Sequence, residues 1–453
     1  MANNAIWLEG WTVQALRREP DETIAEATFG AAPDACPKCG VVGKLYRHGT
    51  KLVKYRDIPT MGKPLTIHAT VPRYRCRECG ETFMQPLPDM DTQRRMTRRL
   101  IDYILTQGIE QTYSAVARHI DVDEKTIRNI CDEHVQMAVT QALEEPPIIL
   151  GIDELTIRKR KRTVFVDVSG RRLIDMIDSM SKEAVARWIS WMPNRERVRI
   201  VTIDMWGPYQ EVAQALLPNA IVVTDKWHIV SKANKALDSV RSRFRKTAKG
   251  ALKRNPHKGR IIMHIKPEKL SPMRRMMLDG LLDNNPLLKA GWETKEGFYG
   301  IWKAKDRAEA ERLFDEWSAS IPASVELEFR PLAKTVEEWR TEVFNFFDHR
   351  FTNAYTEARN RLVKDYNRAG RGYSFDRIRA KALLHQPVTS EPLLLCESCL
   401  GVFPHQAYLS TKHIKPMGTR GEAKMMRLCA NCHRQFYTRM RLVHDANSTS
   451  KSE

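Results

Sequence analysis

The sequence predicts a multidomain α/β protein in which a mixed sheet with a helical insertion lies between two cysteine-rich modules. Three observations lead to this prediction. The chain has 453 residues, which is long for one domain, and 42% of them are hydrophobic. Eight of its nine cysteines form four C-x-x-C pairs, two towards each end. Between residues 146 and 230, short apolar runs alternate with amphipathic stretches, as strands alternate with helices.

The first cysteine-rich module contains two matched knuckles, "CPKCG" and "CRECG", on either side of strand-like runs. In a reducing compartment such pairs indicate zinc rather than disulfides, and the glycine after each second cysteine suits a tight turn. We therefore expect a zinc-ribbon domain at 1–89, with ligands Cys36, Cys39, Cys76 and Cys79. Basic residues along it indicate either a DNA-facing surface or ordinary solvated charge: Lys51, Lys54, Arg56, Arg73, Arg75 and Arg77.

Residues 90–145 have helical periodicity, and "TYSAVARHIDVDEKTIRNICDEH" has the short helix, turn and second amphipathic helix of a helix-turn-helix. The side chains that open the second helix would then face a DNA major groove. They are Lys125, Thr126, Arg128 and Asn129. A helical hairpin with no DNA partner has a similar pattern and stays an alternative. The ninth cysteine, Cys131, falls within the second helix and is expected in its core.

From Pro146 the pattern changes to three consecutive strands, "IILGIDEL", "TVFVDVSG" and "RRLIDMIDS". A helix, a strand, a second helix and a fifth strand follow. The order βββαβαβ is typical of a ribonuclease-H-like fold, which we assign to residues 146–388. Charged helical sequence at about 231–340 predicts an insertion, and a last helix begins near Phe351.

Two of the apolar strands end on aspartates, Asp153 and Asp204. A strand that surfaces there would explain either one alone. In a ribonuclease-H-like sheet, however, the first and fourth strands are neighbours, so these carboxylates would meet. Two adjacent carboxylates repel each other unless a divalent cation lies between them, and Mg²⁺ (or Mn²⁺) prefers such oxygen ligands. Two such ions can activate water and stabilise the leaving oxygen of a phosphodiester.

A third ligand is expected from the last helix, and Glu357 fits because it shares a helical face with Asn360 and Arg361. A carboxylate among amides and bases belongs at a phosphate-bearing site. Arg361 is itself expected to bind DNA. Further along, Arg368 and Arg371 would bind backbone phosphates through their guanidinium groups.

The excess of 74 Lys and Arg over 55 Asp and Glu gives a net charge of +19 and favours a polyanionic partner. Double-stranded DNA is the leading candidate. A membrane surface is the other polyanion. The sequence has no long uncharged apolar run and no signal-peptide pattern, so we expect a cytoplasmic protein.

These motifs together resemble an insertion-sequence transposase of the ISL-three (ISL3) family. The resemblance covers about residues 36–388 and rests on the N-terminal ribbon, on "GIDE" and on two longer stretches, "IDMWGPYQEVAQALLPNAIVVTDKWHIV" and "TNAYTEARNRLVKDYNRAGRGYSFDRIRAK". It implies a DDE catalytic triad of Asp153, Asp204 and Glu357, with a helical insertion before the glutamate.

The stretch "DKWH" contains a competitor for the second ligand position. It is similar to the Asp-x-x-His motif of such transposases, which implies accessory roles for Asp225 and His228. We keep Asp204 as the ligand. The neighbouring Trp206 and Trp227 could stack on an unpaired base, but we expect them in the core.

The C-terminal module, residues 389–453, has a second set of zinc ligands: Cys396, Cys399, Cys429 and Cys432. "KHIKP…LCANCHRQF" also resembles an HNH nuclease module, which implies His413 as a base and His433 as a metal ligand. Lys412 stands where that family supplies an Asp or His ligand, so we favour a zinc-stabilised DNA- or protein-binding appendage.

The sequence therefore predicts a DNA transposase that binds terminal inverted repeats and cuts and joins strands with Mg²⁺. Synapsis of two DNA ends makes a homo-oligomer the expected working form. Two other classes stay open: a sequence-specific DNA-binding regulator with an inert nuclease-like core, and a nuclease that acts through the C-terminal module.

Overall fold

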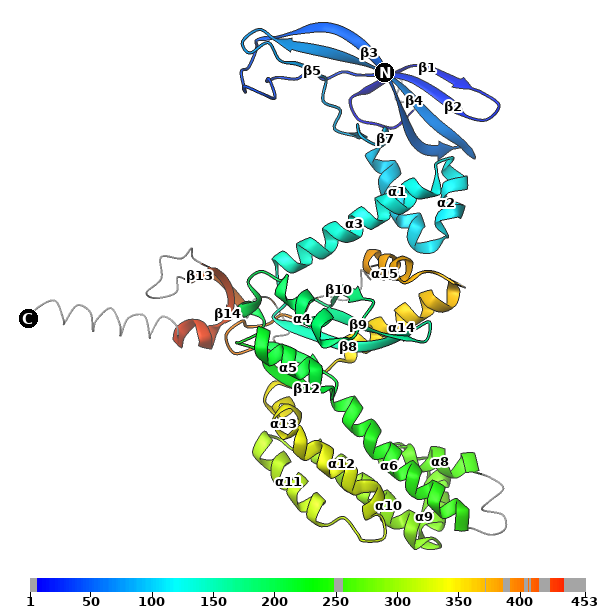
Figure 1. Cartoon of the computed structure of the whole chain (residues 1–453), viewed down its shortest axis with the longest axis vertical. Coiled ribbons are helices and arrows are strands. Elements are labelled where there is room, and N and C mark those ends of the chain that lie inside the picture. The colour runs from blue at the N-terminus through cyan, green and yellow to red at the C-terminus, as the bar shows by residue number, and fades with distance from the viewer. Residues whose placement is uncertain are drawn as a thin grey trace, which may run out of the picture. The chain divides into compact units, whose positions relative to one another are not determined.

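The fold is taken from a computed structural model, which divides into two compact units. The described residues are 6–247, 256–370, 372–385, 392–402, 406, 409–414 and 424–435. The first unit contains residues 1–139 and 369–385, and the second contains residues 140–368 and 386–453. Each unit is described by itself (Figure 1).

The first unit begins with a sheet of order β1-β2-β4-β3-β7-β6, to which β5 is added by pairing with β4. Its strands are β1 (Trp11–Arg18), β2 (Thr23–Phe29), β3 (Leu45–Thr60), β4 (Lys63–Cys76), β5 (Thr82–Met84), β6 (Met90–Asp91) and β7 (Met96–Thr97). The long hairpin of β3 and β4 turns at Met61 and Gly62, both with positive φ. Alternate side chains of these strands are buried in one core that includes Trp11, Ile67 and Val71.

Three helices complete this part of the chain: α1 (Arg98–Glu110), α2 (Tyr113–Ile120) and α3 (Glu124–Glu144). The Thr97 and Thr112 hydroxyls cap α1 and α2 by accepting backbone N–H groups. Asp121 ends α2 in the left-handed conformation, which turns the chain into α3. Their shared core contains the positions predicted for a helix-turn-helix, with Ile127 and Cys131 fully buried. A distant helix, α15 (Phe375–Leu384), belongs to the same unit.

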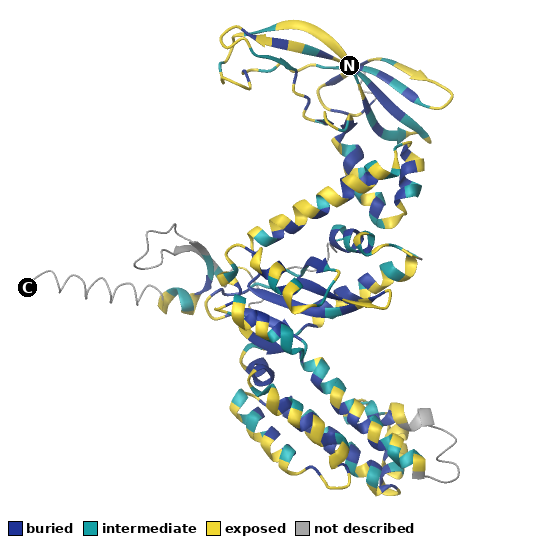
Figure 2. Ribbon diagram, viewed as in Figure 1, coloured by how far each residue is buried: buried dark blue, intermediate teal, exposed yellow. Residues whose placement is uncertain are grey.

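The second unit is built on a five-stranded sheet of order β10-β9-β8-β11-β12. The elements follow the predicted order, namely β8 (Ile149–Ile157), β9 (Arg160–Asp167), β10 (Arg172–Ile177), α4 (Lys182–Ser190), β11 (Ile200–Ile203), α5 (Gly207–Leu216) and β12 (Ile221–Thr224). The first three strands are antiparallel, whereas β8, β11 and β12 run parallel. The strands are almost wholly buried (Figure 2), and α4 and α5 pack on them through Trp188 and Tyr209.

The predicted helical insertion follows β12 directly. Its helices are α6 (Lys226–Thr247), α8 (Pro256–His264), α9 (Pro272–Asp283), α10 (Pro286–Ile301), α11 (Arg307–Ala319) and α12 (Glu326–Glu338), and α13 (Arg340–His349) leads to α14 (Ala354–Ala369). Short 3₁₀ turns occur at Arg195–Arg197 and Pro267–Lys269. Among the helices that the structure describes, none is long and apolar enough to cross a membrane.

The C-terminal segment adds an antiparallel pair, β13 (Leu409–Ile414) and β14 (Lys424–Cys429). It joins the sheet domain through a backbone hydrogen bond of 2.8 Å from Leu393 to Ser169. Glu397 is 8% exposed, and its carboxylate lies 3.9 Å from Arg197.

Candidate active site and DNA-binding modules

Three aspartates lie on neighbouring parallel strands of the second unit. Thr202 of β11 pairs with Gly151 of β8, so two further residues along this register bring Asp204 level with Asp153. Asp225 follows β12 directly, and its backbone N–H donates to the Ile203 carbonyl at 2.8 Å. The three carboxyl groups therefore gather where β11 and β12 end. The prediction that the first strand ends on Asp153 was wrong, because β8 continues beyond its shorter neighbours to Ile157. The strands β11 (IVTI) and β12 (IVVT) contain no charged residue, and each is followed directly by an aspartate.

Helix α14 brings a fourth carboxyl group, that of Glu357, to this edge (Figure 1). The fully buried Asn353 fixes the start of the helix. Its side-chain oxygen accepts a hydrogen bond from the Thr202 hydroxyl, and its amide lies 3.4 Å from the Ile152 carbonyl. One turn later, the Glu357 N–H donates to the Asn353 carbonyl at 2.8 Å.

Gly151 allows this close approach of α14 to β8. A Cβ atom there would lie 2.7 Å from the Thr356 hydroxyl and 3.2 Å from the Asn353 side-chain oxygen. Both neighbours are fully buried and have no room to withdraw. The glycine of "GIDE" is therefore required by packing against the helix that carries Glu357.

Asp153 is 4% exposed and is held at both oxygens. One accepts the Glu154 backbone N–H at 2.8 Å, and the other accepts the Asn360 amide at 2.7 Å. Glu154 itself pairs with Lys161 at 2.9 Å.

The closest donor set joins Asp225, His228 and Glu357, whose potential ligand atoms lie within 4.8 Å of one another. Asp225 is 2% exposed, and it accepts the backbone N–H of Trp227 at 3.3 Å. Asp204 lies near the same group, since the charge of the His228 ring favours the ionised form of Asp204 and so opposes the rise that burial causes in its pKa. The structure thus brings the three predicted catalytic residues and the two predicted accessory residues to one edge of the sheet.

Burial makes the charged form of each carboxyl group at this edge less favourable than it is in water. Burial raises the pKa of Asp153 to about 7, and the nearby Asp204, Asp225 and Glu357 add to the increase. Burial likewise raises the pKa values of those three groups, and His228 opposes the increase at Asp204 and Glu357. Uncompensated carboxylates in such a place repel one another.

One oxygen of each of three carboxyl groups is buried and has no hydrogen-bond partner among the described residues: Asp204 Oδ1, Asp225 Oδ2 and Glu357 Oε1. Buried acceptors are normally satisfied, so three in one cluster indicate a missing partner. Hard carboxylate oxygens are the ligands that divalent cations such as Mg²⁺ take. The residues present therefore fit a divalent metal ion.

Sequence patterns placed Asn353 and Asn360 on the helical face of Glu357 but did not predict that these amides are buried. Together with Thr202, which the sequence did not single out, they bind the acidic strands and α14 together. The expectation that both tryptophans pack in the core was half wrong. Trp206 packs against it, whereas Trp227 is 56% exposed.

Two of the arginines predicted to bind DNA, Arg361 and Arg368, are exposed on α14. Arg368 pairs with Asp365 at 2.5 Å. Arg371 lies outside the described residues.

Both cysteine sets are arranged for tetrahedral binding. In each set the four sulfurs lie within 4.8 Å of one another. Cys36 and Cys79 are 3.6 Å apart and Cys39 and Cys76 are 3.8 Å apart, close to the spacing of about 3.8 Å between thiolates that share one zinc ion at 2.3 Å. Two of the knuckle turns use Gly40 and Gly80 at φ of 72°.

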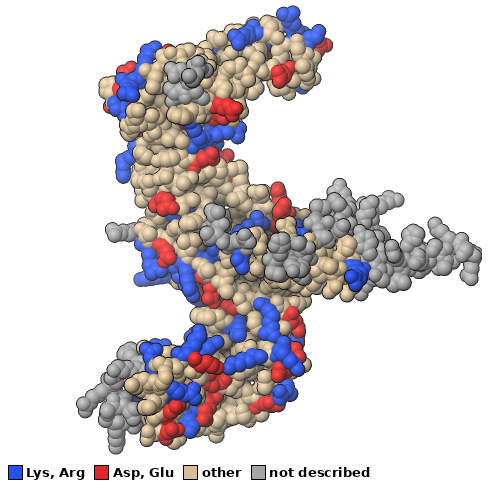
Figure 3. Space-filling view, turned by 180° about the vertical axis from the view of Figure 1, so that it is seen from behind, with Lys and Arg blue, Asp and Glu red and all other residues tan. Residues whose placement is uncertain are grey.

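The basic rim of the ribbon domain is mostly exposed, with one exception. Arg56 is tied to Asp121 at 2.8 Å and to Glu22 at 3.5 Å, so it links β3 to the end of α2 instead of facing DNA. On the face drawn in Figure 3, Lys and Arg side chains are spread widely, with Asp and Glu between them.

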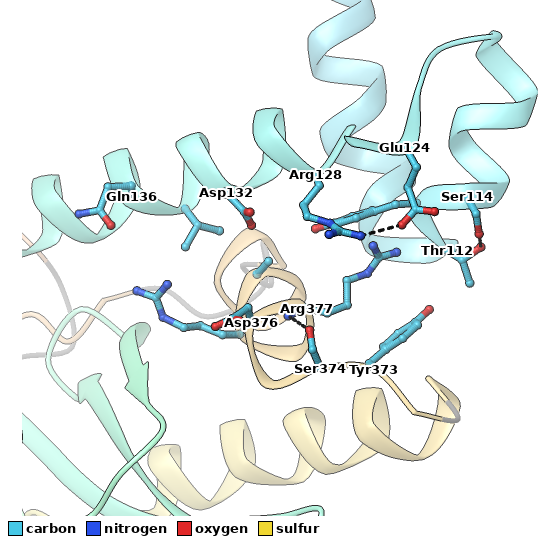
Figure 4. Close-up of a pocket in the computed structure, with 14 residues that line it drawn as sticks. Thr112, Ser114, Glu124, Arg128, Asp132, Gln136, Tyr373, Ser374, Asp376 and Arg377 are labelled. Atoms are coloured by element: carbon cyan, nitrogen blue, oxygen red, sulfur yellow. Dashed lines mark hydrogen bonds and ion pairs between the residues drawn. The ribbon is translucent and has the colours of Figure 1, made fainter. Parts of the chain in front are cut away.

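The predicted recognition residues open α3 as expected, with Lys125, Arg128 and Asn129 exposed and Thr126 half-buried. Arg128 pairs with Glu124 at 3.0 Å and lines a cavity of about 670 Å³ that α15 closes from the other side (Figure 4). Arg377 of α15 extends into this region and covers the ring of Tyr113.

In the C-terminal module, His433 follows Cys432 and is half-buried. His413 lies on β13 opposite Met425, and its side chain is outside the described part.

Comparison with known proteins agrees with these modules. Residues 150–382 match a family described as a transposase of the ISL3 DDE type. Residues 32–79 match the zinc finger of transposases IS204, IS1001, IS1096 and IS1165, and residues 85–135 match the helix-turn-helix domain of transposase family ISL3.

Two curated relatives are transposases of insertion sequences. The transposase for IS1001 of Bordetella parapertussis is 23% identical over 382 residues, which cover 81% of this chain and 93% of the relative. The transposase for IS1557 of Mycobacterium tuberculosis is 21% identical over 372 residues, covering 75% and 82%. The chain is a member of the ISL3 family of transposases, with a zinc ribbon and a helix-turn-helix as its DNA-binding domains.

Proposed function

We propose that this transposase cuts and joins DNA at the acidic edge of a ribonuclease-H-like domain, with Asp153, Asp204 and Glu357 as its metal ligands. The observation that carries the proposal is the convergence of buried and half-buried carboxyl groups from four separate segments, with three oxygens that lack partners among the described residues. The strand order β10-β9-β8-β11-β12 supports the ribonuclease-H-like assignment.

Mg²⁺ or Mn²⁺ bound there would act as a Lewis acid on the scissile phosphate and on the attacking water or 3′ hydroxyl. The protein's own task is positioning. Asn360 and the Glu154 N–H orient Asp153, and Asn353 fixes the helix that presents Glu357. Asp225 and His228 act as accessory groups that hold Glu357 in place.

The ribbon and the helix-turn-helix bind the terminal inverted repeats of the element. Two DNA ends must be brought together for transposition, so the working complex contains more than one copy of the chain. The C-terminal module serves as a zinc-stabilised appendage, because Lys412 places a cation where an HNH site needs a ligand.

The test is an end-cleavage assay in Mg²⁺ with Asp153→Asn, Asp204→Asn, Glu357→Gln and His413→Ala. The first three variants lose at least about a hundredfold in rate, because each removes one charge that the metal ions require. The His413 variant cuts normally. Mn²⁺ binding, followed by electron paramagnetic resonance, weakens in the same three variants.

Other outcomes separate the alternatives. Normal cutting by the Asp153 and Glu357 variants contradicts the site. Loss of cutting only in His413→Ala assigns cleavage to the C-terminal module. Specific end binding without any nicking by the wild type indicates a DNA-binding regulator. If Asp225→Asn loses Mn²⁺ and activity while Asp204→Asn keeps both, Asp225 is the second ligand.

A further inference from the structure

The hairpin between β8 and β9 has a turn that its residues do not favour. Two residues, Arg158 and Lys159, connect the strands, and both have positive φ, 51° and 63°. Such a turn follows the twist of a hairpin but normally requires Asn-Gly, because Cβ crowds the left-handed conformation. Strain kept at a defined point is a sign that the side chains there are needed.

A buried arginine braces the base of this turn. Arg162 is 3% exposed, and its Nη1 donates to the carbonyl oxygens of Ile157 and Arg160, the last pair of the ladder. Its Nε lies 2.8 Å from Asp178 Oδ1, so its charge is balanced. The backbone of the tip is thereby held in one shape, which fixes where its side chains leave the hairpin.

The tip is strongly cationic. Arg158, Lys159, Arg160 and Lys161 are consecutive and exposed. Lys161 pairs with Glu154. Within the described ranges, Lys159 and Arg160 form no ion pair with another side chain. Neighbouring exposed cations without anionic partners form a local positive field that attracts an anion such as a DNA phosphate.

The tip stands on the same strand as the catalytic aspartate. Ile157 is four residues beyond Asp153 along the strand, a rise of about 13 Å. This equals about four steps along a DNA strand at 3.4 Å each. A duplex that runs along β8 with its scissile phosphate at Asp153 would pass within reach of the tip.

We propose that the β8–β9 tip is a phosphate-binding finger that grips the DNA backbone within about four nucleotides of the cleaved bond. The inference rests on the proposed active site and deepens it by naming a DNA contact outside the ribbon and the helix-turn-helix. Lys159 and Arg160 are the positioning residues, since they act on the backbone and not on the reacting atoms.

The test scans the DNA backbone with single neutral methylphosphonate linkages and measures single-turnover end cleavage in Mg²⁺. On wild-type protein, neutral linkages within about four nucleotides of the scissile bond slow cleavage about tenfold, as expected for loss of a charged hydrogen bond. Lys159→Gln combined with Arg160→Gln slows cleavage of unmodified DNA similarly. That variant gains no further defect from the same linkages, because the two changes remove one interaction.

The matched control is Lys303→Gln combined with Lys334→Gln, which removes the same charge from two exposed positions of the helical insertion, one in the turn after α10 and one on α12. It keeps the wild-type cleavage rate and the wild-type sensitivity to neutral linkages.

A second variant, Arg158→Asn with Lys159→Gly, relaxes the turn: its melting temperature rises while its cleavage rate falls. A tip with a purely structural role would gain stability and keep full activity.

The inference is overturned if Lys159→Gln with Arg160→Gln stays as sensitive to the neighbouring neutral linkages as the wild type. It is also overturned if that variant changes only the oligomeric state in sedimentation, since the tip would then bind protein. Failure of the active-site assignment is distinguished by Asp153→Asn. If that variant cuts normally, the site is wrong. If it is inactive while the finger variants match the wild type, only the finger is wrong.

Discussion

Asp153 lies almost fully buried in the middle of strand β8, beside three other carboxyl groups. Removing its charged form from water is unfavourable, which is why its pKa rises to about 7. The two hydrogen bonds from Glu154 and Asn360 orient the group but do not neutralise it. Without a bound metal ion, the ionised form of this buried group therefore destabilises the folded protein.

The raised pKa of Asp153 predicts that the stability of the protein depends on pH in buffer without added Mg²⁺. Between pH 4 and 7 the folded state keeps the proton of Asp153 that the unfolded chain releases, so the free energy of unfolding falls as pH rises. Asp153→Asn removes this loss of stability at high pH, but it also weakens one of the two hydrogen bonds that the carboxylate accepts from Glu154 and Asn360. We expect the variant to be more stable than the wild type by roughly 1–3 kcal/mol at pH 8 and equal or weaker at pH 4. Urea unfolding at both pH values measures the difference, and a variant less stable at pH 8 contradicts it.

Gly151 gives a second prediction, because an added methyl group has no room. Gly151→Ala forces the side chains of Thr356 and Asn353 apart from β8, at a cost of about 1–3 kcal/mol, and moves Glu357 away from Asp153. Both thermal stability and end cleavage fall. Gly280→Ala is the control: nothing lies near its Cβ and it is inside helix α9, so stability rises by up to about 1 kcal/mol. Equal behaviour of the two variants would mean that Gly151 is not a packing position.

At the scale of single residues, sequence reasoning could place the aspartates because apolar runs end abruptly on them. It could not predict that the amides beside Glu357 are buried. Asn353 and Asn360 look like ordinary helix polars, and only the three-dimensional packing of α14 against β8 makes them interior residues. The exposure of Trp227 was missed for the same reason, since a tryptophan beside an apolar strand is normally covered.

At the scale of elements, the two cysteine modules are similar in their knuckles although their sequences differ. Cys36 and Cys396 each accept the N–H of the residue four positions later through their carbonyls, Gly40 in one and Leu400 in the other. Leu400 has φ of 60°, a conformation that glycine adopts more easily. The spacing of the cysteines was sufficient to predict both sites, because zinc sets the geometry that the chain must reach.

The modules predict a zinc content of about two ions per chain, with separate effects of their loss. Cys39→Ser removes one ion and weakens binding of end DNA, because the β3–β4 hairpin loses its closure at the knuckles. Cys399→Ser removes the other ion and leaves specific binding by the ribbon intact. Plasma mass spectrometry and gel shifts measure the two properties. A chain that holds two ions after either substitution would show that the cysteines are not the ligands.

At the scale of the whole molecule, the chain does not fold as consecutive segments. Helix α15 lies beyond Glu357 in sequence, yet it belongs to the unit of the ribbon and the helix-turn-helix. Leu384 joins the hydrophobic cluster of α1–α3, and the buried Lys381 donates to the Gln111 carbonyl at 3.1 Å. The order of strands and helices along the chain could be predicted from local patterns. The docking of α15 could not, because its apolar face gives no sign of which core it enters.

This arrangement predicts that a fragment of residues 1–145 is an incomplete domain. Without α15, the apolar surface that Leu384 covers is exposed and the Tyr113 ring loses the Arg377 guanidinium. Fusion of residues 369–385 through a flexible linker of about 20 residues restores both contacts and raises the melting temperature of the zinc-loaded fragment by about 5 °C or more. The matched control carries Leu384→Asp in the fused helix and melts like the fragment alone, because a carboxylate cannot enter the cluster. Differential scanning calorimetry distinguishes the three proteins. Equal melting of all three would mean that α15 contributes nothing to the DNA-binding unit, and the helix would then belong with the catalytic domain that precedes it in sequence.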